Sequence, residues 1–321
     1  MNATKVFSNT TKYGFRIVLQ KIIKIVVSFA STRRILNSIY LGLNSRKRSV
    51  FHTLFAKIFV DTNDDASDGV WKVVFAGKSI LMPLNSSRMW LDWDSAVSII
   101  GHDIDVKETY EAIINSHSEK PDIFVDIGAN YGTHSLLFLV HEISTLTFEP
   151  NSSCHDYFIE MCKLNNVKPK LEHMALGEEH GYVELAYPMN ETWLGTTEST
   201  SMKRLGKVKT LEMERVEQVL LDSYLPSFRG KRVLIKIDTE GNELAVLLGA
   251  TKIIREVQPK IIFESWDGDE RSKIFSFFDS EKYSIYSLPW APYSDAHSLA
   301  SEEYIESSAT NFIAIPTAYR L

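Results

Sequence analysis

The stretch Ile123-Phe-Val-Asp-Ile-Gly-Ala-Asn-Tyr-Gly132 decides how this chain of 321 residues folds. Residues 123–127 form a short, mainly apolar segment that runs directly into a turn bounded by two glycines. Residues 133–141 then carry apolar side chains at helical spacing. A strand, a glycine-containing turn and a helix in this order are typical of the first nucleotide-binding unit of an open α/β sheet. We therefore expect a mostly parallel, doubly wound α/β domain that binds a ligand at this turn.

The side chains of the turn indicate which ligand it binds. Gly128 and Gly132 allow the backbone to turn tightly and to approach a ligand where a side chain would collide with it. Asp126, at the end of the strand, can hold the ammonium of a methionine moiety directly or through water. Asn130 stands where dinucleotide sites have their middle glycine. This pattern favours S-adenosylmethionine over a nicotinamide dinucleotide, with a plain strand-to-helix connection as the alternative interpretation.

The next two predicted strands supply further candidate contacts to the cofactor. The first, 145–149, ends in Glu149, and an acid at this place can accept hydrogen bonds from both hydroxyls of a ribose. The second, 170–174, leads into Ala175, where the chain would pass beneath an adenine. We expect contacts from Met174 and from the backbone at Ala175, although a sheet edge without a ligand role is an equally open interpretation.

A second group of candidate site residues lies in Val233-Leu-Ile-Lys-Ile-Asp-Thr-Glu-Gly-Asn-Glu243, which reads as an apolar strand with an acidic carboxyl end. Ligands bind at such strand ends in open α/β sheets. A carboxylate there can take the proton of an attacking hydroxyl, so Asp238 is the predicted catalytic base and Glu240 its predicted assistant. Glu243 is expected to cap the following helix or to pair with another group. Lys236 lies on the same strand face as Asp238 and is expected to neutralise it.

Further acids follow the predicted strand 260–264. Glu264 ends this strand, and Asp267 and Asp269 lie in the loop after it. Together with Asp238 they could bind a hard divalent cation. Solvated loop acids are far commoner, so the sequence predicts no metal site.

The segments around these strands carry less information. The polar segment 189–203 has a length typical of a lid. Two last strands are predicted at 283–287 and 311–315, and the loop between them holds Trp290 and Tyr293. These aromatic rings fit either the floor of a site for a flat substrate or ordinary surface packing.

Charge is distributed unevenly along the chain, whose net charge is −6. The basic arm 1–60 has no acidic residue, and its segment 14–30 shows the pattern of an amphipathic helix. Its apolar runs are too short to span a bilayer, and no signal-peptide cleavage site follows them. Two interpretations stay open, namely packing on the acidic body or a partner subunit, and peripheral contact with an anionic membrane. The acidic remainder disfavours nucleic acid as a partner.

The predicted domain organisation follows from these patterns. The basic arm precedes a hairpin and helical cap at 61–120, and the catalytic domain occupies 121–321. The two cysteines, Cys154 and Cys162, match neither a zinc pattern nor a disulfide framework. Their scarcity indicates a reducing compartment, and hence a cytoplasmic location with membrane association through the arm left open.

Taken in order, the motifs of residues 70–316 resemble the FkbM family of methyltransferases. The motifs that carry the resemblance are Val125-Asp-Ile-Gly-Ala-Asn-Tyr-Gly132, Phe148-Glu-Pro-Asn151, Ala175-Leu-Gly177, Ile235-Lys-Ile-Asp-Thr-Glu-Gly241, Leu247-Leu-Gly-Ala250 and Ile262-Phe-Glu264. The resemblance implies a Rossmann-like class I methyltransferase fold whose last strand is antiparallel. It also implies that S-adenosylmethionine lies against Asp126, Gly128, Asn130, Gly132 and Glu149, with Asp238 beside the methyl group.

The usual reaction of this family implies O-methylation of a hydroxyl on a sugar, a glycolipid or a related small-molecule or glycan acceptor. His134 stands where relatives often carry an aromatic residue, so we assign it no catalytic role. Two other functions stay open at this point, namely a nicotinamide-dependent oxidoreductase and a scaffold that binds the cofactor without turnover. A nucleic-acid methyltransferase is disfavoured, because the body is acidic and the Asp238 strand end lacks an Asn-Pro-Pro-Tyr-like motif.

Overall fold

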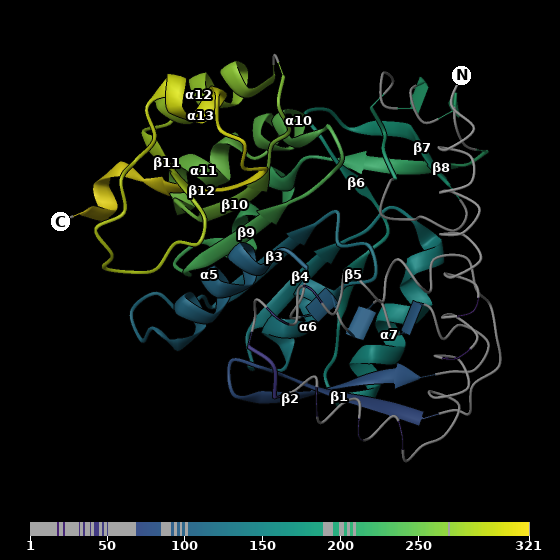
Figure 1. Cartoon of the computed structure of the whole chain (residues 1–321). Coiled ribbons are helices and arrows are strands. Elements are labelled where there is room, and N and C mark those ends of the chain that lie inside the picture. Colours follow the sequence, from purple (N-terminus) through teal and green to yellow (C-terminus); the bar gives the residue numbers. More distant parts are fainter. Residues whose placement is uncertain are drawn as a thin grey trace, which may run out of the picture. The chain divides into compact units, whose positions relative to one another are not determined.

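The structure is a computed structural model of the chain (Figure 1). It describes residues 69–84, 102–188, 195–198, 211–268 and 270–320, together with single residues or short runs within 18–50, 91–99 and 202–210. Apart from Val18 and Ile22, the predicted amphipathic segment 14–30 lies outside the described residues, so the interpretations of the basic arm stay predictions. Within the described part of the chain, no helix is long and apolar enough to cross a membrane.

The chain forms two compact units, Met1–Ile104 and Asp105–Leu321. In the first unit, β1 (Gly69–Phe75) and β2 (Lys78–Leu84) pair as an antiparallel hairpin. Ala76 and Gly77 connect the strands with φ of 44° and 78°, the positive values that tight hairpin turns need. The hairpin predicted within residues 61–120 is therefore confirmed, with Gly77 in its turn.

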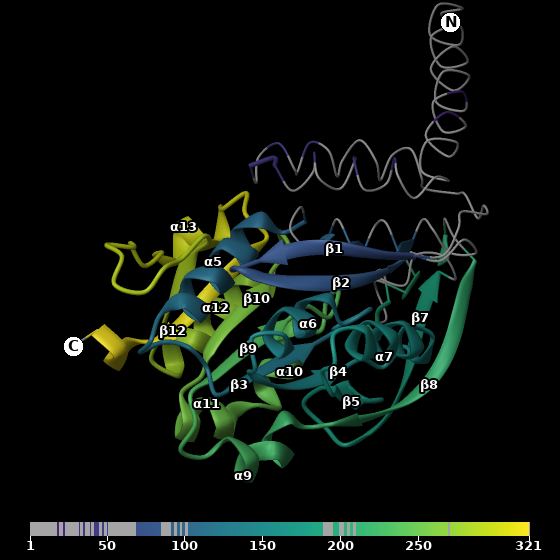
Figure 2. The ribbon, with the colours of Figure 1, turned by 90° about the horizontal axis from the view of Figure 1, so that it is seen from below.

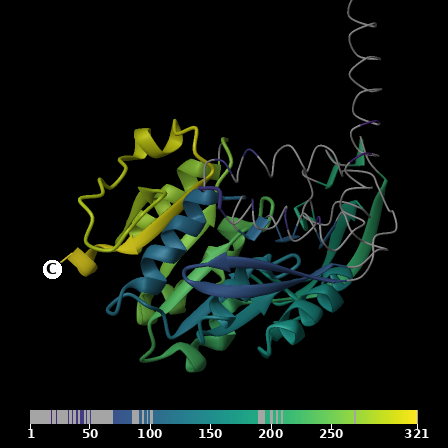
Figure 3. The same ribbon diagram turned by 60° about the horizontal axis from the view of Figure 1, so that its bottom comes forward.

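The second unit is built on a sheet of seven strands in the order β11-β12-β10-β9-β3-β4-β5 (Figure 3). Their bounds are β3 Ile123–Ile127, β4 Ser144–Phe148, β5 Lys170–Glu172, β9 Val233–Ile237, β10 Lys260–Glu264, β11 Tyr283–Ser287 and β12 Asn311–Pro316. The five strands from β10 to β5 pair in parallel, and β12 runs antiparallel between β10 and β11. This topology confirms the predicted doubly wound sheet with an antiparallel last strand.

Helices cover both faces of this sheet (Figure 2). The helices are α5 Ile104–Asn115, α6 Thr133–Leu139, α7 His155–Leu164, α9 Leu225–Phe228, α10 Glu243–Leu248, α11 Thr251–Val257, α12 Glu270–Ser280 and α13 Ser301–Ile305. On one face, Phe124 of β3 stacks on Phe138 of α6 with 3.7 Å between ring centroids, and Tyr110 of α5 packs edge-on against both rings. The alternate residues of β3, β9 and β10 form the main core with α10, α11 and α12 on the other face.

A separate three-stranded sheet, in the order β6-β8-β7, follows β5. It consists of β6 Ala175–Leu176, β7 Gly181–Pro188 and β8 Leu211–Val219. Four of the nine residues of β8 are charged, and only Val216 and Val219 of this strand are buried.

One buried cation ties the end of β10 to the chain that enters β12. Arg271 of α12 is 1% exposed and donates hydrogen bonds to five backbone carbonyls. The acceptors, at 2.5–3.2 Å, are the carbonyls of Ser265, Tyr304, Ile305, Ser307 and Ala309. The guanidinium also lies over the rings of Tyr304 and Phe312.

Arg271→Met is expected to lower the free energy of unfolding by at least about 3 kcal/mol, because each buried carbonyl left without a donor costs about 1–3 kcal/mol. Urea unfolding followed by circular dichroism measures this loss. The control is Arg229→Gln, which removes an exposed ion pair to Glu256 and is expected to cost less than about 1 kcal/mol. Equal losses in the two variants would contradict the structural role of Arg271.

Candidate active site at the carboxyl edge of the sheet

The turn after β3 is held against the end of β9. Gly128 has φ of 77°, and a Cβ at this position would lie 1.8 Å from the carbonyl oxygen of Asp238. Gly132 has φ of 67°, and a Cβ there would lie 2.3 Å from the ring of Phe158. The sequence analysis attributed the need for glycine to a nearby ligand, but the atoms that exclude a side chain belong to the protein itself. Because Gly128 has no side chain, the predicted cofactor turn after β3 can lie directly against Asp238 at the end of β9.

Asp126, within β3, is completely buried. Its Oδ2 accepts hydrogen bonds from the backbone N–H of Ser135 at 2.9 Å and from the Ser135 hydroxyl at 2.7 Å. Burial raises the pKa of this carboxyl, and the charge of Lys236 opposes the rise. Its Oδ1 is also buried and has no hydrogen-bond partner among the described residues. One oxygen of Asp126 therefore orients α6, and the other remains as an acceptor for a donor such as water or an ammonium group.

Glu149 follows β4 directly and is 6% exposed. Its Oε2 accepts from the backbone N–H of Asn130 at 2.5 Å, and its Oε1 accepts from that of Asn151 at 2.7 Å. Asn130 has φ of 49°, so the turn presents its N–H to this acid from a left-handed conformation. Burial raises the pKa of Glu149 to about 7, and the two backbone donors oppose the rise. Because a carboxylate has about four acceptor sites, Glu149 can bind both donors and still accept from a ribose.

The last two predicted cofactor contacts, Met174 and Ala175, have partners within the protein. Met174 packs against the main core, and its sulfur accepts from the hydroxyl of Tyr224 at 3.5 Å. Ala175 lies in β6, where it pairs with Gln218 of β8 and is buried in the three-stranded sheet. Among the described residues, no hydrogen bond links either side chain to Asp126 or Glu149. The predicted contacts of Met174 and Ala175 with adenine stay predictions.

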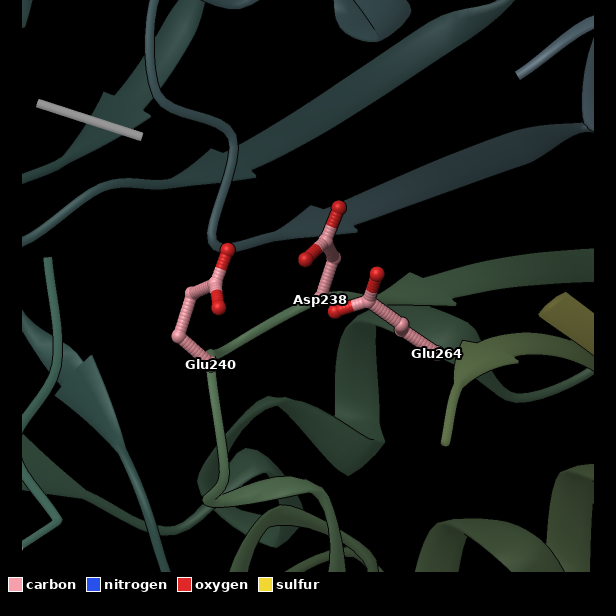
Figure 4. Close-up of side chains that lie close together, drawn as sticks. All are labelled: Asp238, Glu240 and Glu264. Carbon is pink, nitrogen blue, oxygen red and sulfur yellow. The ribbon is translucent and has the colours of Figure 1, made fainter. Parts of the chain in front are cut away.

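Three carboxylates converge at the carboxyl ends of β9 and β10 (Figure 4). Asp238 and Glu240 follow β9 and Glu264 ends β10, and one oxygen of each lies within 4.8 Å of the others. Figure 4 shows the three groups turned toward one another. The Nζ of Lys236, which is 3% exposed, donates to Oδ2 of Asp238 at 2.7 Å. This ion pair confirms the expected neutralisation of Asp238.

Burial and mutual repulsion raise the pKa values of the two glutamates in this cluster. Burial contributes most and the charge of Asp238 next, so the pKa of Glu240 rises to about 8 and that of Glu264 to about 9. At neutral pH these two groups hold their protons and can donate hydrogen bonds. Proton-donating and proton-accepting groups therefore stand side by side, an arrangement typical of acid and base chemistry.

Glu243, at the start of α10, organises the loop after β9. Its Oε1 accepts from the backbone N–H and the hydroxyl of Thr239 at 2.8 and 2.9 Å, and from the N–H of Gly241 at 3.3 Å. No side-chain hydrogen bond caps α10 at Asn242, its N-cap residue, so Glu243 fixes the preceding loop and the expected capping role is not confirmed. The described part of the predicted lid, residues 195–198, contacts the same loop, because the Thr196 hydroxyl donates to the carbonyl of Glu240 at 3.0 Å.

The aromatic residue at this edge was not predicted. Tyr293 lies at the opposite edge of the sheet, because its hydroxyl bonds that of Ser118, which precedes the amino end of β3, at 2.6 Å. Trp266 instead donates its Nε1–H to Oε2 of Glu264 at 2.9 Å. Its position two residues after the strand-end acid was the only signal in the sequence. Asp269, one of the acids considered as a ligand of a divalent cation, lies outside the described residues.

Comparisons with known proteins identify the family. Residues 126–285, about half of the chain, match the methyltransferase FkbM domain. The chain is also similar to the methyltransferase sdnD of Sordaria araneosa, with 27% identity over 198 residues, covering 52% of this chain and 76% of that protein. This chain belongs to the FkbM family of methyltransferases. The predicted methyltransferase is thereby confirmed, and family membership implies S-adenosylmethionine as the methyl donor.

Two solved methyltransferase structures are similar to the chain at low TM-scores. The methyltransferase FkbM of Methylobacillus flagellatus KT has 14% identity and a TM-score of 0.36, with 72% of this chain and 56% of that chain covered. The SAM-dependent methyltransferase of Agrobacterium tumefaciens has 9% identity and a TM-score of 0.38, with 79% and 72% covered. This chain therefore spans less than two thirds of the length of the first of these proteins.

The raised pKa of Glu264 predicts a pH-dependent difference in stability. Below its unfolded value of 4.5 the group is protonated in both states, and between 4.5 and about 9 only the folded state keeps the proton. Stability from this group is therefore lost as the pH rises toward 9. Glu264→Gln removes this loss, so the variant should gain at least about 1.4 kcal/mol relative to the wild type between pH 5 and pH 9, the equivalent of one pKa unit.

Urea unfolding of both proteins at the two pH values measures this difference. Glu256→Gln, which changes an exposed partner of Arg229, is the matched control and should follow the wild type. A Glu264→Gln variant that runs parallel to the wild type would show that Glu264 is ionised in the folded protein at neutral pH.

Proposed function

We propose that the chain transfers a methyl group from S-adenosylmethionine to a hydroxyl of a sugar, a glycolipid or a related small-molecule or glycan acceptor, with Asp238 as the general base. The observation that supports this proposal is the contact between the turn after β3 and the acidic end of β9. The backbone of Asp238 touches the turn at Gly128, and its side chain meets Glu240 and Glu264. Asp238, the proposed base, therefore lies beside the predicted cofactor turn.

The residues around the turn fit S-adenosylmethionine. The unpartnered Oδ1 of Asp126 is a suitable acceptor for the ammonium of its methionine part, and Glu149 for the hydroxyls of its ribose. Met174 and the backbone of Ala175 are the expected neighbours of its adenine. When bound, the cofactor supplies a methyl group that is activated by a positively charged sulfur.

The chain's own residues handle the proton of the acceptor. The Nζ of Lys236 lies 2.7 Å from Oδ2 of Asp238 and so fixes the orientation of this carboxylate. The acceptor hydroxyl would give its proton to Oδ1 of Asp238, the oxygen that is not bonded to Lys236. Glu240, which holds its own proton, would donate a hydrogen bond that orients the acceptor.

Asp238→Asn is expected to lower kcat by about 100-fold or more, the usual contribution of a general base. The affinity for S-adenosylhomocysteine should stay within about 3-fold, since calorimetry reports the cofactor site alone. Asp279→Asn, an exposed change on α12, is the control. Full turnover by a folded Asp238→Asn variant would remove Asp238 as the base.

Glu149→Gln is expected to weaken binding of S-adenosylhomocysteine by about 10-fold or more, because hydrogen bonds to a charged acceptor contribute about 1.5–3 kcal/mol. Calorimetry on the folded variant measures this loss, and Glu142→Gln, an exposed change after α6, is the control. The same measurement with NAD tests the oxidoreductase alternative. Tight binding of NAD alone would contradict the proposed cofactor.

A further inference from the structure

Trp266 combines an exposed ring with a fixed orientation beside the carboxylate cluster. Its side chain is 60% exposed, although burial of a large aromatic surface is the general tendency. The hydrogen bond from Nε1 to Glu264 consumes its one polar group and orients the indole. Glu264 is itself within 4.8 Å of Asp238 and Glu240. An aromatic face is thus presented to solvent next to the predicted catalytic base.

The backbone that carries Trp266 is anchored at the preceding residue. The carbonyl of Ser265 accepts from Nη2 of Arg271 at 2.8 Å, and its hydroxyl accepts from that of Tyr304 at 2.8 Å. The N–H of Ser265 donates to the carbonyl of Thr310 at 2.7 Å. Because these partners are held in the core, the indole begins from a fixed point. Little conformational freedom is then lost when a ligand packs against it.

The other exposed aromatic side chains of the described residues have different surroundings. Tyr182 stacks on the guanidinium of Arg215 at 4.5 Å, in the three-stranded sheet. Tyr293 bonds Ser118 at the amino edge of the main sheet. Within the described part of the chain, Trp266 is the exposed aromatic residue that bonds a member of the carboxylate cluster. The exposed ring of Trp266 therefore lies beside the proposed position of the acceptor.

We propose that Trp266 is a specificity-determining residue that selects a ring-shaped, hydroxyl-bearing acceptor, and that Glu264 acts with it. A pyranose ring has an apolar C–H face and a rim of hydroxyls. The C–H face packs on the indole, and a ring hydroxyl hydrogen-bonds to Glu264. An open-chain polyol has the same hydroxyls without a flat apolar face and does not make the first contact. This assignment rests on the proposed sugar methylation and adds the residue that selects the ring.

The test measures acceptor binding and turnover in the full chain. Saturation-transfer NMR in the presence of S-adenosylhomocysteine uses methyl glycosides of hexoses and 6-deoxyhexoses, with sorbitol as the open-chain probe. The wild type should transfer saturation to the ring C–H protons. Trp266→Ala should lose this signal and raise KM for the glycosides at least about 10-fold, with kcat within about 3-fold, as expected for loss of uniform binding.

Two further variants separate the role of the ring from general damage. Trp266→Phe keeps an aromatic face without the N–H and should restore most of the binding that Trp266→Ala loses. Tyr293→Ala removes an exposed aromatic residue at the opposite edge and should leave KM unchanged. Calorimetry with S-adenosylhomocysteine should give wild-type affinity for all three variants.

Each failure has its own signature. If the wild type methylates glycosides and Trp266→Ala does so with unchanged KM, the role of Trp266 is overturned and the proposed function stands. If Trp266→Ala weakens glycosides and sorbitol equally, selection of the ring is overturned. A wild type that neither binds nor methylates any glycoside but methylates another class of acceptor overturns both proposals.

Discussion

The close approach of β9 to the turn after β3 is the constraint on which the site depends. The carbonyl oxygen of Asp238 occupies the space that a side chain at residue 128 would need. The N–H of Asp238 donates to the carbonyl of Ile127 at 3.0 Å, so the two strands stay paired up to their last residues. The register that follows sets Asp126 opposite Lys236. A larger residue than Gly128 would separate the predicted base from the predicted cofactor turn.

This register also decides how the buried charges are balanced. Lys236 lies between carboxylates on two neighbouring strands, since it pairs with Asp238 and lowers the pKa of Asp126 against the effect of burial. One ammonium does not neutralise the whole group, so Glu240 and Glu264 keep their protons. Burying an uncompensated charge is far more costly than binding a proton. The result is a site in which Lys236 pairs with Asp238, while burial keeps Glu240 and Glu264 protonated.

Local sequence patterns predicted the buried strands well, but they could not predict which side chains from different strands meet. The bounds 123–127 and 260–264 were predicted correctly, because buried parallel strands are apolar runs that end at polar residues. The sequence grouped Glu264 with Asp238 as strand-end acids, but it did not indicate that Trp266 bonds Glu264 beside them.

The antiparallel last strand determines which backbone groups lie beside the carboxyl end of β10. Because β12 runs against β10, Asn311 at its amino end pairs with Glu264 at the carboxyl end of β10. The chain that enters β12 therefore passes the reaction edge of the sheet, and its carbonyls come within reach of Arg271. With a parallel last strand, these carbonyls would lie at the opposite edge and Ser265 would lose its contact with Thr310. The parallel pairing of β9 and β10 places Glu264 beside Asp238, and the direction of β12 connects the packing around Arg271 to the same edge of the sheet.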